Sequence, residues 1–336
     1  MWQTVGHDHA IHLLQNSIET GRVSHAYLFS GSRQIGKATL ARDFAKALNC
    51  LEPDRPCSRC RSCKKIEASI HPDVQVIDLE EGSKNISIDA VRRLQEGVAL
   101  RPFEGQTKVY IIEEAERLSE PAANSLLKTL EEPPPSVVMI LTTLDATSLL
   151  PTVVSRCQQL ELRPVPSDAV EAALRERHEV DQERARLLAS LARGRMGWAV
   201  QVASSRNALD KRSEQMEKLL ALPGMGRVGR FAYAAELATL YGRDPEAARS
   251  TLEMWQSWWR DLLLSRLGVT KLVVNADLRS RMNADASGYS VEALGRMVKS
   301  IQQTITLLGQ NVNPRLALEA LMLSVPKGAN GKVASR

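Results

Sequence analysis

The sequence predicts an α/β domain built on a parallel sheet, followed by a small helical domain and an all-α C-terminal domain. Short apolar runs alternate with helical periodicities from residue 8 to about residue 162, as strands and helices do in a doubly wound fold. A segment with two prolines follows at 163–166, and no strand pattern recurs after it. The rest of the chain repeats its apolar residues at helical spacing, which predicts helices alone.

The expected strands are short runs, several of them apolar throughout, at 26–29, 74–77, 109–112, 137–141 and 159–162. Helical patterns lie between them at 37–49, 88–100 and 121–131. Ser119 is placed to cap the last of these helices, and Pro121 falls in its first turn. At the N-terminus, His7, His9 and His12 fit a solvated helix start better than a metal site.

The change of pattern sets the expected domain boundaries. The α/β domain covers 1–165 with a cysteine-rich insertion at 50–63, a helical lid domain covers 166–205, a helical domain covers 206–326, and 327–336 is expected to be a disordered tail. Long helices are expected in the third domain at 207–221, 228–241, 245–267, 289–309 and 313–324. Trp255, Trp258 and Trp259 fall at helical spacing, which favours a core or a subunit interface over chemistry.

Composition is that of a folded protein. The chain has 336 residues, 43% of them hydrophobic and 25% charged, which is close to the globular average and suits two or three domains. The net charge of +5 mildly favours an acidic partner such as nucleic acid. Neither a leader peptide nor a membrane span is expected. A cytoplasmic location follows, in which thiols stay reduced and clustered cysteines bind metal.

A glycine-rich turn runs from Gly31 to Lys37, directly after the first expected strand and at the start of a helix. In that setting backbone N–H groups cradle phosphates and the lysine reaches them, so Gly31, Gly36 and Lys37 fit a nucleotide site. Ala38, however, stands where a Ser or Thr hydroxyl binds magnesium. The hydroxyl of Thr39 is turned about 100° away on a helix.

The acidic positions after the third strand depart from an ATPase pattern as well. Phosphate-loop ATPases usually place an Asp there to hold the metal and often a Glu to orient water; this chain has Glu113 and Glu114. Metal ions supply several kcal/mol of charge stabilisation in such reactions, so hydrolysis is expected to be weak. Three readings of Lys37 stay open: an exposed lysine at a helix start, nucleotide binding without efficient hydrolysis, and a working ATPase.

Four cysteines, Cys50, Cys57, Cys60 and Cys63, follow the spacing CxxxxxxCxxCxxC. They can supply the four sulfur ligands of a closed, structural zinc site. Reduced thiols, disulfides and a redox pair are the alternatives. Bases surround the cysteines at Arg55, Arg59, Arg61, Lys64 and Lys65. They offset the formal charge of about −2 on a four-thiolate zinc site, or they form a surface for a partner or DNA.

Two further segments have a recognisable pattern. Residues 122–133 read Ala-Ala-Asn-Ser-Leu-Leu-Lys-Thr-Leu-Glu-Glu-Pro, and 149–157 end in Ser-Arg-Cys. Together with the cysteine module, and in this order, they resemble bacterial clamp-loader subunits of DNA polymerase III, members of the AAA+ class. The resemblance is strong from residue 1 to about 165 and extends to the remainder only in layout. It implies an AAA+ core, a lid, and a collar that holds subunits together.

The resemblance also implies partners and a subunit type. The expected assembly is a heteropentamer with motor (gamma/tau) and delta subunits that loads the sliding clamp at primed DNA. Motor subunits resemble complete ATPases with Gly-Lys-Thr in the loop, whereas the delta prime type is often degenerate there. Ala38 and Glu113 indicate the delta prime type, which is not an enzyme by itself. The motor's sensor arginine would fall at Gly197, although Arg195 lies close by.

The same resemblance makes Arg156, in Ser-Arg-Cys, an arginine finger offered in trans to a neighbouring ATPase subunit. Pairing with a carboxylate such as Glu161 is the ordinary alternative. Thr142 and Thr143 match the region of the family's first sensor, or are plain strand-end threonines. Arg92 and Arg93 face either DNA or solvent. The rival function is an ATP-hydrolysing motor subunit or a free-standing AAA+ enzyme.

Overall fold

The computed structural model describes residues 1–79, 83, 85–310 and 312–327. The chain forms two compact units, Met1–Gln201 and Val202–Arg336. The expected disordered tail at 327–336 lies outside the described residues except for Lys327. Among the described residues, no helix has the length and apolar character that a membrane span requires.

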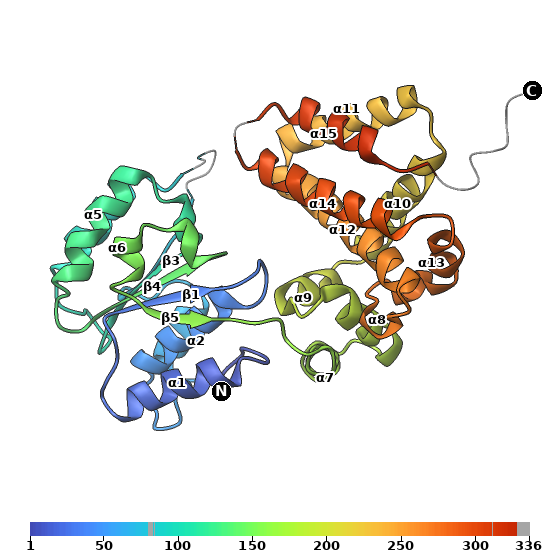
Figure 1. Ribbon diagram of the computed structural model, residues 1–336. Helices are drawn as coiled ribbons and strands as arrows, with labels where there is room; N and C mark the ends of the chain where they lie inside the picture. The colour runs from blue at the N-terminus through green and yellow to red at the C-terminus, as the bar shows by residue number, and fades with distance from the viewer. Residues whose placement is uncertain (80–82, 84, 311, 328–336) are drawn as a thin grey trace, which may run out of the picture. The chain divides into compact units, whose positions relative to one another are not determined.

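The first unit contains a parallel sheet with the strand order β2-β3-β4-β1-β5 (Figure 1). Its strands are β1 (Ala26–Ser30), β2 (Val74–Ile77), β3 (Lys108–Ile112), β4 (Val137–Thr143) and β5 (Gln158–Glu161). Every residue of β3 and β4 is buried, as expected for parallel strands covered on both faces. The predicted α/β fold with a parallel sheet is therefore confirmed.

Alternation along the strands divides the core of this unit into two layers. Tyr27 and Phe29 of β1 pack with α1 (Asp8–Glu19) and α2 (Lys37–Asn49), whereas Leu28 packs on the opposite face with α4 (Ile88–Val98) and α5 (Glu120–Glu131). Figure 1 shows α1 and α2 on one side of the sheet and α5 on the other. Helix α2 therefore starts at the carboxyl end of β1, where a ligand site of such a fold is found.

Helix α5 is fixed at its start and along its inner face. The Ser119 hydroxyl accepts a hydrogen bond from the Ala122 N–H at 3.4 Å, and Pro121 lies in the first turn, as the sequence predicts. Leu126 and Leu130 are buried in the sheet core. The C-terminal end of α5 is consequently held in place by the core beneath it.

Short helices complete the first unit. They are α3 (Arg61–Glu67), α6 (Pro151–Val154), α7 (Ser167–His178), α8 (Gln182–Ala192) and α9 (Met196–Ser204), the last extending past the unit boundary. Helices α7 to α9 match the short helices expected after the two-proline segment. Helix α3, in the cysteine module, was not among the expected elements.

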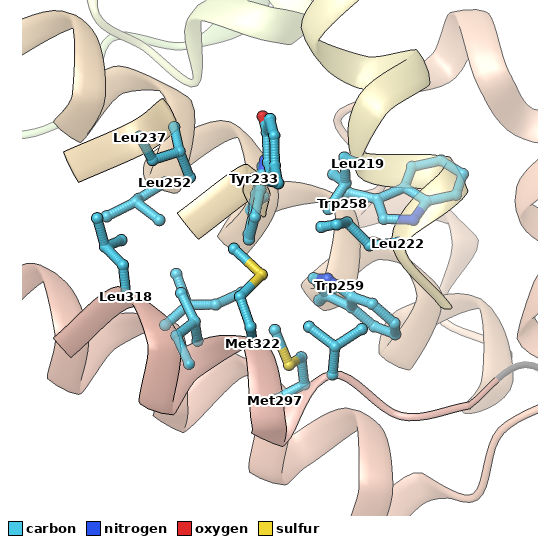
Figure 2. Close-up of a cluster of buried hydrophobic side chains, with 14 of the residues drawn as sticks. Leu219, Leu222, Tyr233, Leu237, Leu252, Trp258, Trp259, Met297, Leu318 and Met322 are labelled. Carbon is cyan, nitrogen blue, oxygen red and sulfur yellow. The ribbon is translucent and has the colours of Figure 1, made fainter. Parts of the chain in front are cut away.

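In its described part the second unit consists of helices packed around one core (Figure 2). The α-helices are α10 (Ala208–Ala221), α11 (Arg227–Arg243), α12 (Pro245–Arg266), α13 (Arg279–Ala286), α14 (Val291–Leu308) and α15 (Pro314–Ser324). Trp255, Trp258 and Trp259 are all buried in it. Trp255 stacks on Tyr233 with ring centroids 5.7 Å apart. The three tryptophans are thus core residues, one of the two roles that their spacing favours.

Candidate nucleotide and metal sites

The glycine-rich loop joins β1 to α2 and has the backbone that its sequence predicts. Gly31 has a φ of +148°, and a Cβ there would come within 2.6 Å of the Leu162 carbonyl oxygen. Gly36 has a φ of +120° and precedes the first turn of α2. Both positions need glycine, because side chains rarely tolerate these conformations. The imidazole of His7 is buried and contacts the Ile35 carbonyl at 3.0 Å, so His7 supports the loop and is not solvated as expected.

Lys37 is folded back onto its own loop. Its Nζ donates to the carbonyl oxygens of Gly31 at 2.6 Å and Ser32 at 2.9 Å. Burial lowers the pKa of Lys37 to about 8, although the carboxylates of Glu116 and Glu114 act in the opposite direction. The lysine is therefore partly buried and bonded to the loop.

Helix α9, in the segment expected to form a lid, touches the loop directly. The Gly197 N–H donates to the Gln34 carbonyl at 2.7 Å, and a Cβ at Gly197 would come within 2.8 Å of the same oxygen. The side chains of Gln34 and Gln201 form a second contact at 2.6 Å. At the position expected for the motor's sensor arginine, this chain thus places a glycine that allows the lid to contact the loop backbone.

Glu113 is engaged by an arginine. It follows β3 and forms an ion pair with the guanidinium of Arg42 from α2, at 3.1 Å. Burial raises the pKa of Glu113, although Arg42 opposes the shift. A metal ion at this carboxylate would have to compete with Arg42.

Glu114 is engaged in the same way. Its carboxylate lies 3.6 Å from Arg33 and is also paired with Arg117 at 2.5 Å. Its backbone is left-handed, with a φ of 49°, and its N–H donates to the Thr142 hydroxyl at 3.2 Å. Glu114 therefore lies beside the end of β4, and its charge is balanced by neighbouring arginines.

The candidate sensor threonines have different partners. Thr142 accepts the bond from Glu114, whereas the Thr143 hydroxyl donates to the Asp145 carbonyl at 3.1 Å and contacts Ser148 at 3.2 Å. The Thr143 carbonyl accepts the Gly31 N–H at 3.2 Å. Thr143 thus adjoins the loop by its backbone while its hydroxyl stabilises the turn after β4. Thr39 lies in α2 one residue after Ala38, so its side chain is turned about 100° around the helix from that position, as expected.

The four cysteines of the insertion lie together. The sulfur atoms of Cys50, Cys57, Cys60 and Cys63 are all within 4.8 Å of one another, and the Sγ atoms of Cys57 and Cys63 are 4.0 Å apart. Backbone N–H groups point at three of the sulfurs, from Cys57 to Cys50, from Cys60 to Cys57 and from Cys63 to Cys60. Such donors stabilise thiolate charge. The arrangement can hold a metal ion, and four sulfur donors suit zinc.

Cys157 differs from these four in its surroundings. It lies in the sheet core outside the cluster, and burial raises the pKa of its thiol to about 12. It is a core thiol.

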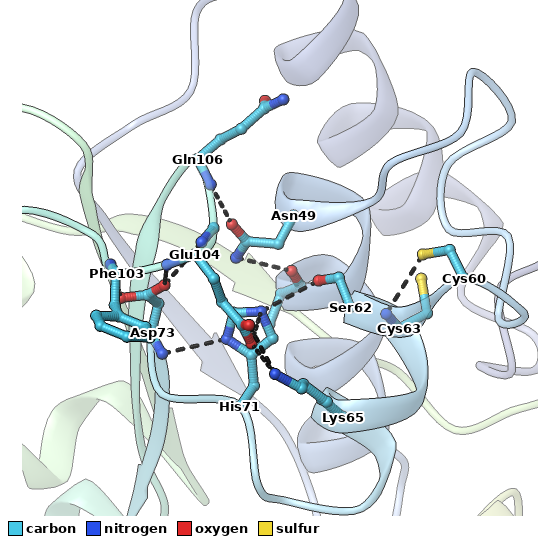
Figure 3. Close-up of polar contacts among 12 residues, drawn as sticks. Asn49, Cys60, Ser62, Cys63, Lys65, His71, Asp73, Phe103, Glu104 and Gln106 are labelled. Atoms are coloured by element: carbon cyan, nitrogen blue, oxygen red, sulfur yellow. Dashed lines mark hydrogen bonds and ion pairs between the residues drawn. The ribbon is translucent and has the colours of Figure 1, made fainter.

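A polar network beside the cysteine module was not predicted (Figure 3). The buried Asp73 carboxylate accepts three backbone N–H groups, from Phe103, Glu104 and Gly105, at 2.7 to 2.8 Å. Asn49, the last residue of α2, binds the same loop through Gln106. These bonds join the chain on either side of the module, at Asn49 and Asp73, to the loop before β3. The sequence indicates this network only weakly, because a single Asp and a single Asn have no diagnostic spacing.

Arg156 lies between α6 and β5, and its guanidinium is at the end of α5. Nη2 donates to the Glu131 carboxylate at 2.6 Å, and Nη1 donates to the Thr152 carbonyl at 2.9 Å. Its side chain is 34% exposed. The partner considered from the sequence, Glu161, is instead 3.9 Å from Arg163. The residue expected to act on a neighbour is therefore anchored on one side and open on the other.

The candidate DNA-facing pair lies on α4. Arg92 forms an exposed ion pair with Asp89 at 3.2 Å. Arg93 is exposed on the same helix. This placement allows contact with solvent or with a partner.

Two families match the chain. One, described as DNA polymerase III, delta subunit, matches residues 6–166, and the other, described as DNA polymerase III, delta subunit, C terminal, matches residues 206–326. The chain is 31% identical to DNA polymerase III subunit delta' of Bacillus subtilis over 317 residues, which cover 94% of this chain and 95% of the relative.

Other relatives are longer. DNA polymerase III subunit tau of Escherichia coli is 37% identical over 256 residues, covering 74% of this chain but only 37% of tau. Among solved structures, a DNA polymerase III gamma subunit-related protein from Thermotoga maritima shares 19% identity with a TM-score of 0.47, covering 94% of this chain and 99% of that one. This last likeness is too distant to bear on function.

Proposed function

The chain belongs to the DNA polymerase III delta-subunit family, and from this membership we propose that it acts in DNA replication as a clamp-loader subunit of the delta prime type. Similarity to a delta' subunit along 94% of the chain supports the subunit type. Its partners in this function are motor subunits of the gamma/tau type, a delta subunit, the sliding clamp and primed DNA.

The chain's own nucleotide site is proposed to be degenerate. Ala38 supplies no hydroxyl for magnesium, Arg42 engages Glu113, and Arg33 and Arg117 flank Glu114. Magnesium needs near-ideal octahedral geometry from oxygen ligands, and these contacts disfavour it. The loop is therefore expected to bind nucleotide weakly or not at all.

The proposed chemical contribution is Arg156 acting in trans. The observation that carries it is the partly exposed guanidinium at the end of α5, presented by a family motif that keeps its arginine while the chain's own loop departs from an ATPase pattern. A delocalised charge near the γ-phosphate of a neighbour stabilises the charge that develops in phosphoryl transfer. Such a finger is worth about 10³ to 10⁵ in rate.

Reconstitution with motor subunits tests this role. We expect Arg156→Ala to lower the DNA- and clamp-stimulated ATPase rate of the complex by at least about tenfold, whereas Arg163→Ala, which removes a more exposed arginine from the same region, leaves it unchanged. Equal rates for Arg156→Ala and the unmodified protein would show that Arg156 is not an arginine finger.

A motor-type function is the second candidate. It is favoured by the 37% identity to a tau subunit and by a loop backbone that keeps the form of a phosphate site. Turnover by the isolated chain separates the two: ATP hydrolysis without DNA or clamp, lost in Lys37→Ala, supports the motor. Absence of turnover supports the delta prime type, and binding of labelled ATP then measures how far the site has degenerated.

We also propose that Cys50, Cys57, Cys60 and Cys63 hold one structural zinc ion. The close approach of the four sulfurs and the backbone N–H donors that face them support this assignment. Zinc in a closed four-sulfur site has no open position for water and contributes to folding.

A further inference from the structure

Glu131, which binds the guanidinium of Arg156, lies at the end of a helix that is packed against the core. Glu131 is the last residue of α5, whose inner face is buried through Leu126 and Leu130. Helix C-termini carry a partial negative charge, so they attract a guanidinium even before the carboxylate is counted. Arg156 thus binds the end of a helix that the core holds in place.

The contacts of Arg156 leave part of its donor set open. A guanidinium carries five N–H donors, and the recorded bonds go to Glu131, Thr152 and Ser155 from the two terminal nitrogens. Nε is not used by these bonds. The planar group can therefore keep its anchor while presenting further N–H groups to a phosphate oxygen.

From this geometry we propose that Glu131 is a positioning residue for Arg156, which holds the guanidinium in the orientation that the neighbouring subunit's nucleotide requires. The inference rests on the proposed role of Arg156 in trans. A free arginine side chain samples many rotamers, and ordering it costs conformational entropy. Because Glu131 orders Arg156 before the subunits meet, that entropy cost is not added to the activation free energy of the reaction. Glu131 itself does not touch the nucleotide.

Stabilisation of the fold is the competing explanation for the pair. The Glu131 side chain is 51% exposed and that of Arg156 is 34% exposed, and exposed ion pairs contribute little to folding. Loss of Glu131 is therefore expected to change the neighbour's catalytic rate while the thermal stability of this chain stays nearly constant.

The test uses the reconstituted complex with motor subunits, clamp and primed DNA. We expect Glu131→Ala to lower kcat for ATP hydrolysis by about three- to thirtyfold with KM for ATP within about twofold, because the finger acts on the transition state and not on ATP binding. Glu131→Gln, which keeps an acceptor oxygen, should retain a higher rate than Glu131→Ala. The control is Glu132→Ala, which removes the exposed carboxylate next to Glu131; its rate should be unchanged.

A double variant separates positioning from an independent effect. If Glu131 acts through Arg156, the rate of Glu131→Ala/Arg156→Ala equals that of Arg156→Ala alone. A further fall in the double variant, or an unchanged or raised rate in Glu131→Ala, overturns the inference while a strong effect of Arg156→Ala leaves the proposed function standing. No effect of Arg156→Ala would instead contradict the proposed role of Arg156 in trans, on which the inference rests. Melting curves for each variant identify any loss of rate that is caused by unfolding. If Glu131→Ala is unstable, Glu131→Gln, which has nearly the same shape as Glu131, provides the test instead.

Discussion

At the residue scale, the charged groups around the loop are paired with one another. Lys37 bonds to loop carbonyls, Arg42 to Glu113, and Arg33 and Arg117 to Glu114. Each of these side chains would have to exchange a partner within the chain for a phosphate or a metal ion. Replacement of hydrogen bonds in this way yields little net free energy, which explains why retention of Lys37 alone does not predict an active site.

The lowered pKa of Lys37 can be measured directly. Because burial favours the neutral amine, the pH at which Lys37 reacts half-maximally with an acylating reagent should be about 8, against the usual value of 10.5. Peptide mass spectrometry after labelling across pH 7 to 10 would give this midpoint for each lysine. Lys271, whose side chain is exposed, serves as the comparison. A Lys37 midpoint near 10.5 would contradict the burial seen here.

At the element scale, the contact between α9 and the loop depends on the absence of a side chain at Gly197. Its hydrogen bond to Gln34 and its close approach to the same carbonyl fix the lid helix against the loop. Tight packing of this kind tolerates added volume poorly. The lid and the loop therefore behave as one element of the first unit.

Gly197→Ala should destabilise the protein by about 1–3 kcal/mol, because the added methyl group would lie 2.8 Å from the Gln34 oxygen. Gly295→Ala is the matched change in the interior of α14, where a Cβ meets nothing within 4 Å. It should stabilise by about 0.5–1 kcal/mol, because alanine favours helix more than glycine does. Urea unfolding of both variants measures the two changes in the free energy of unfolding. If both changes had the same sign, the explanation would be refuted.

The cysteine module should lose its metal when one ligand is removed. We expect roughly one equivalent of zinc in the unmodified protein and well under that in Cys60→Ser, which should also melt at a lower temperature, since structural zinc contributes directly to folding. Elemental analysis and thermal melts measure both effects. Cys157→Ala removes a cysteine outside the cluster and should retain the metal; full metal content in Cys60→Ser would disprove the four-ligand site.

Regular elements could be predicted from the sequence, and long-range polar contacts could not. The expected strands at 109–112 and 137–141 lie within β3 and β4, because buried parallel strands are marked by apolar runs. Helix α13 was not expected, since its sequence is polar and only Met282 and Ala286 are buried. The partner of Arg156 was missed because Glu131 lies 25 residues away and no local spacing connects them.

At the scale of the whole molecule, the two units have separate cores. The buried clusters of the first unit contain residues between Ala10 and Leu162, whereas the cluster of the second lies between Met216 and Val325. Cooperativity in folding arises from a shared core. The two units are therefore expected to unfold as separate cooperative blocks.

Calorimetry can assign a transition to each unit. Trp255→Ala removes a fully buried side chain from the second core and should cost that unit about 3–5 kcal/mol. Phe44→Ala should lower only the transition of the first unit for the same reason. If both substitutions shifted one common transition, the two cores would not be independent.

The burial of Trp255, Trp258 and Trp259 in one core also decides what an optical experiment sees. The chain has five tryptophans, and these three lie in the second unit, whereas Trp2 and Trp198 belong to the first. Intrinsic emission excited at the indole band is thus weighted toward the second unit. Unfolding around the glycine-rich loop would leave much of that emission unchanged. A fluorescence melt can therefore give a native-like signal at temperatures where the loop has already unfolded.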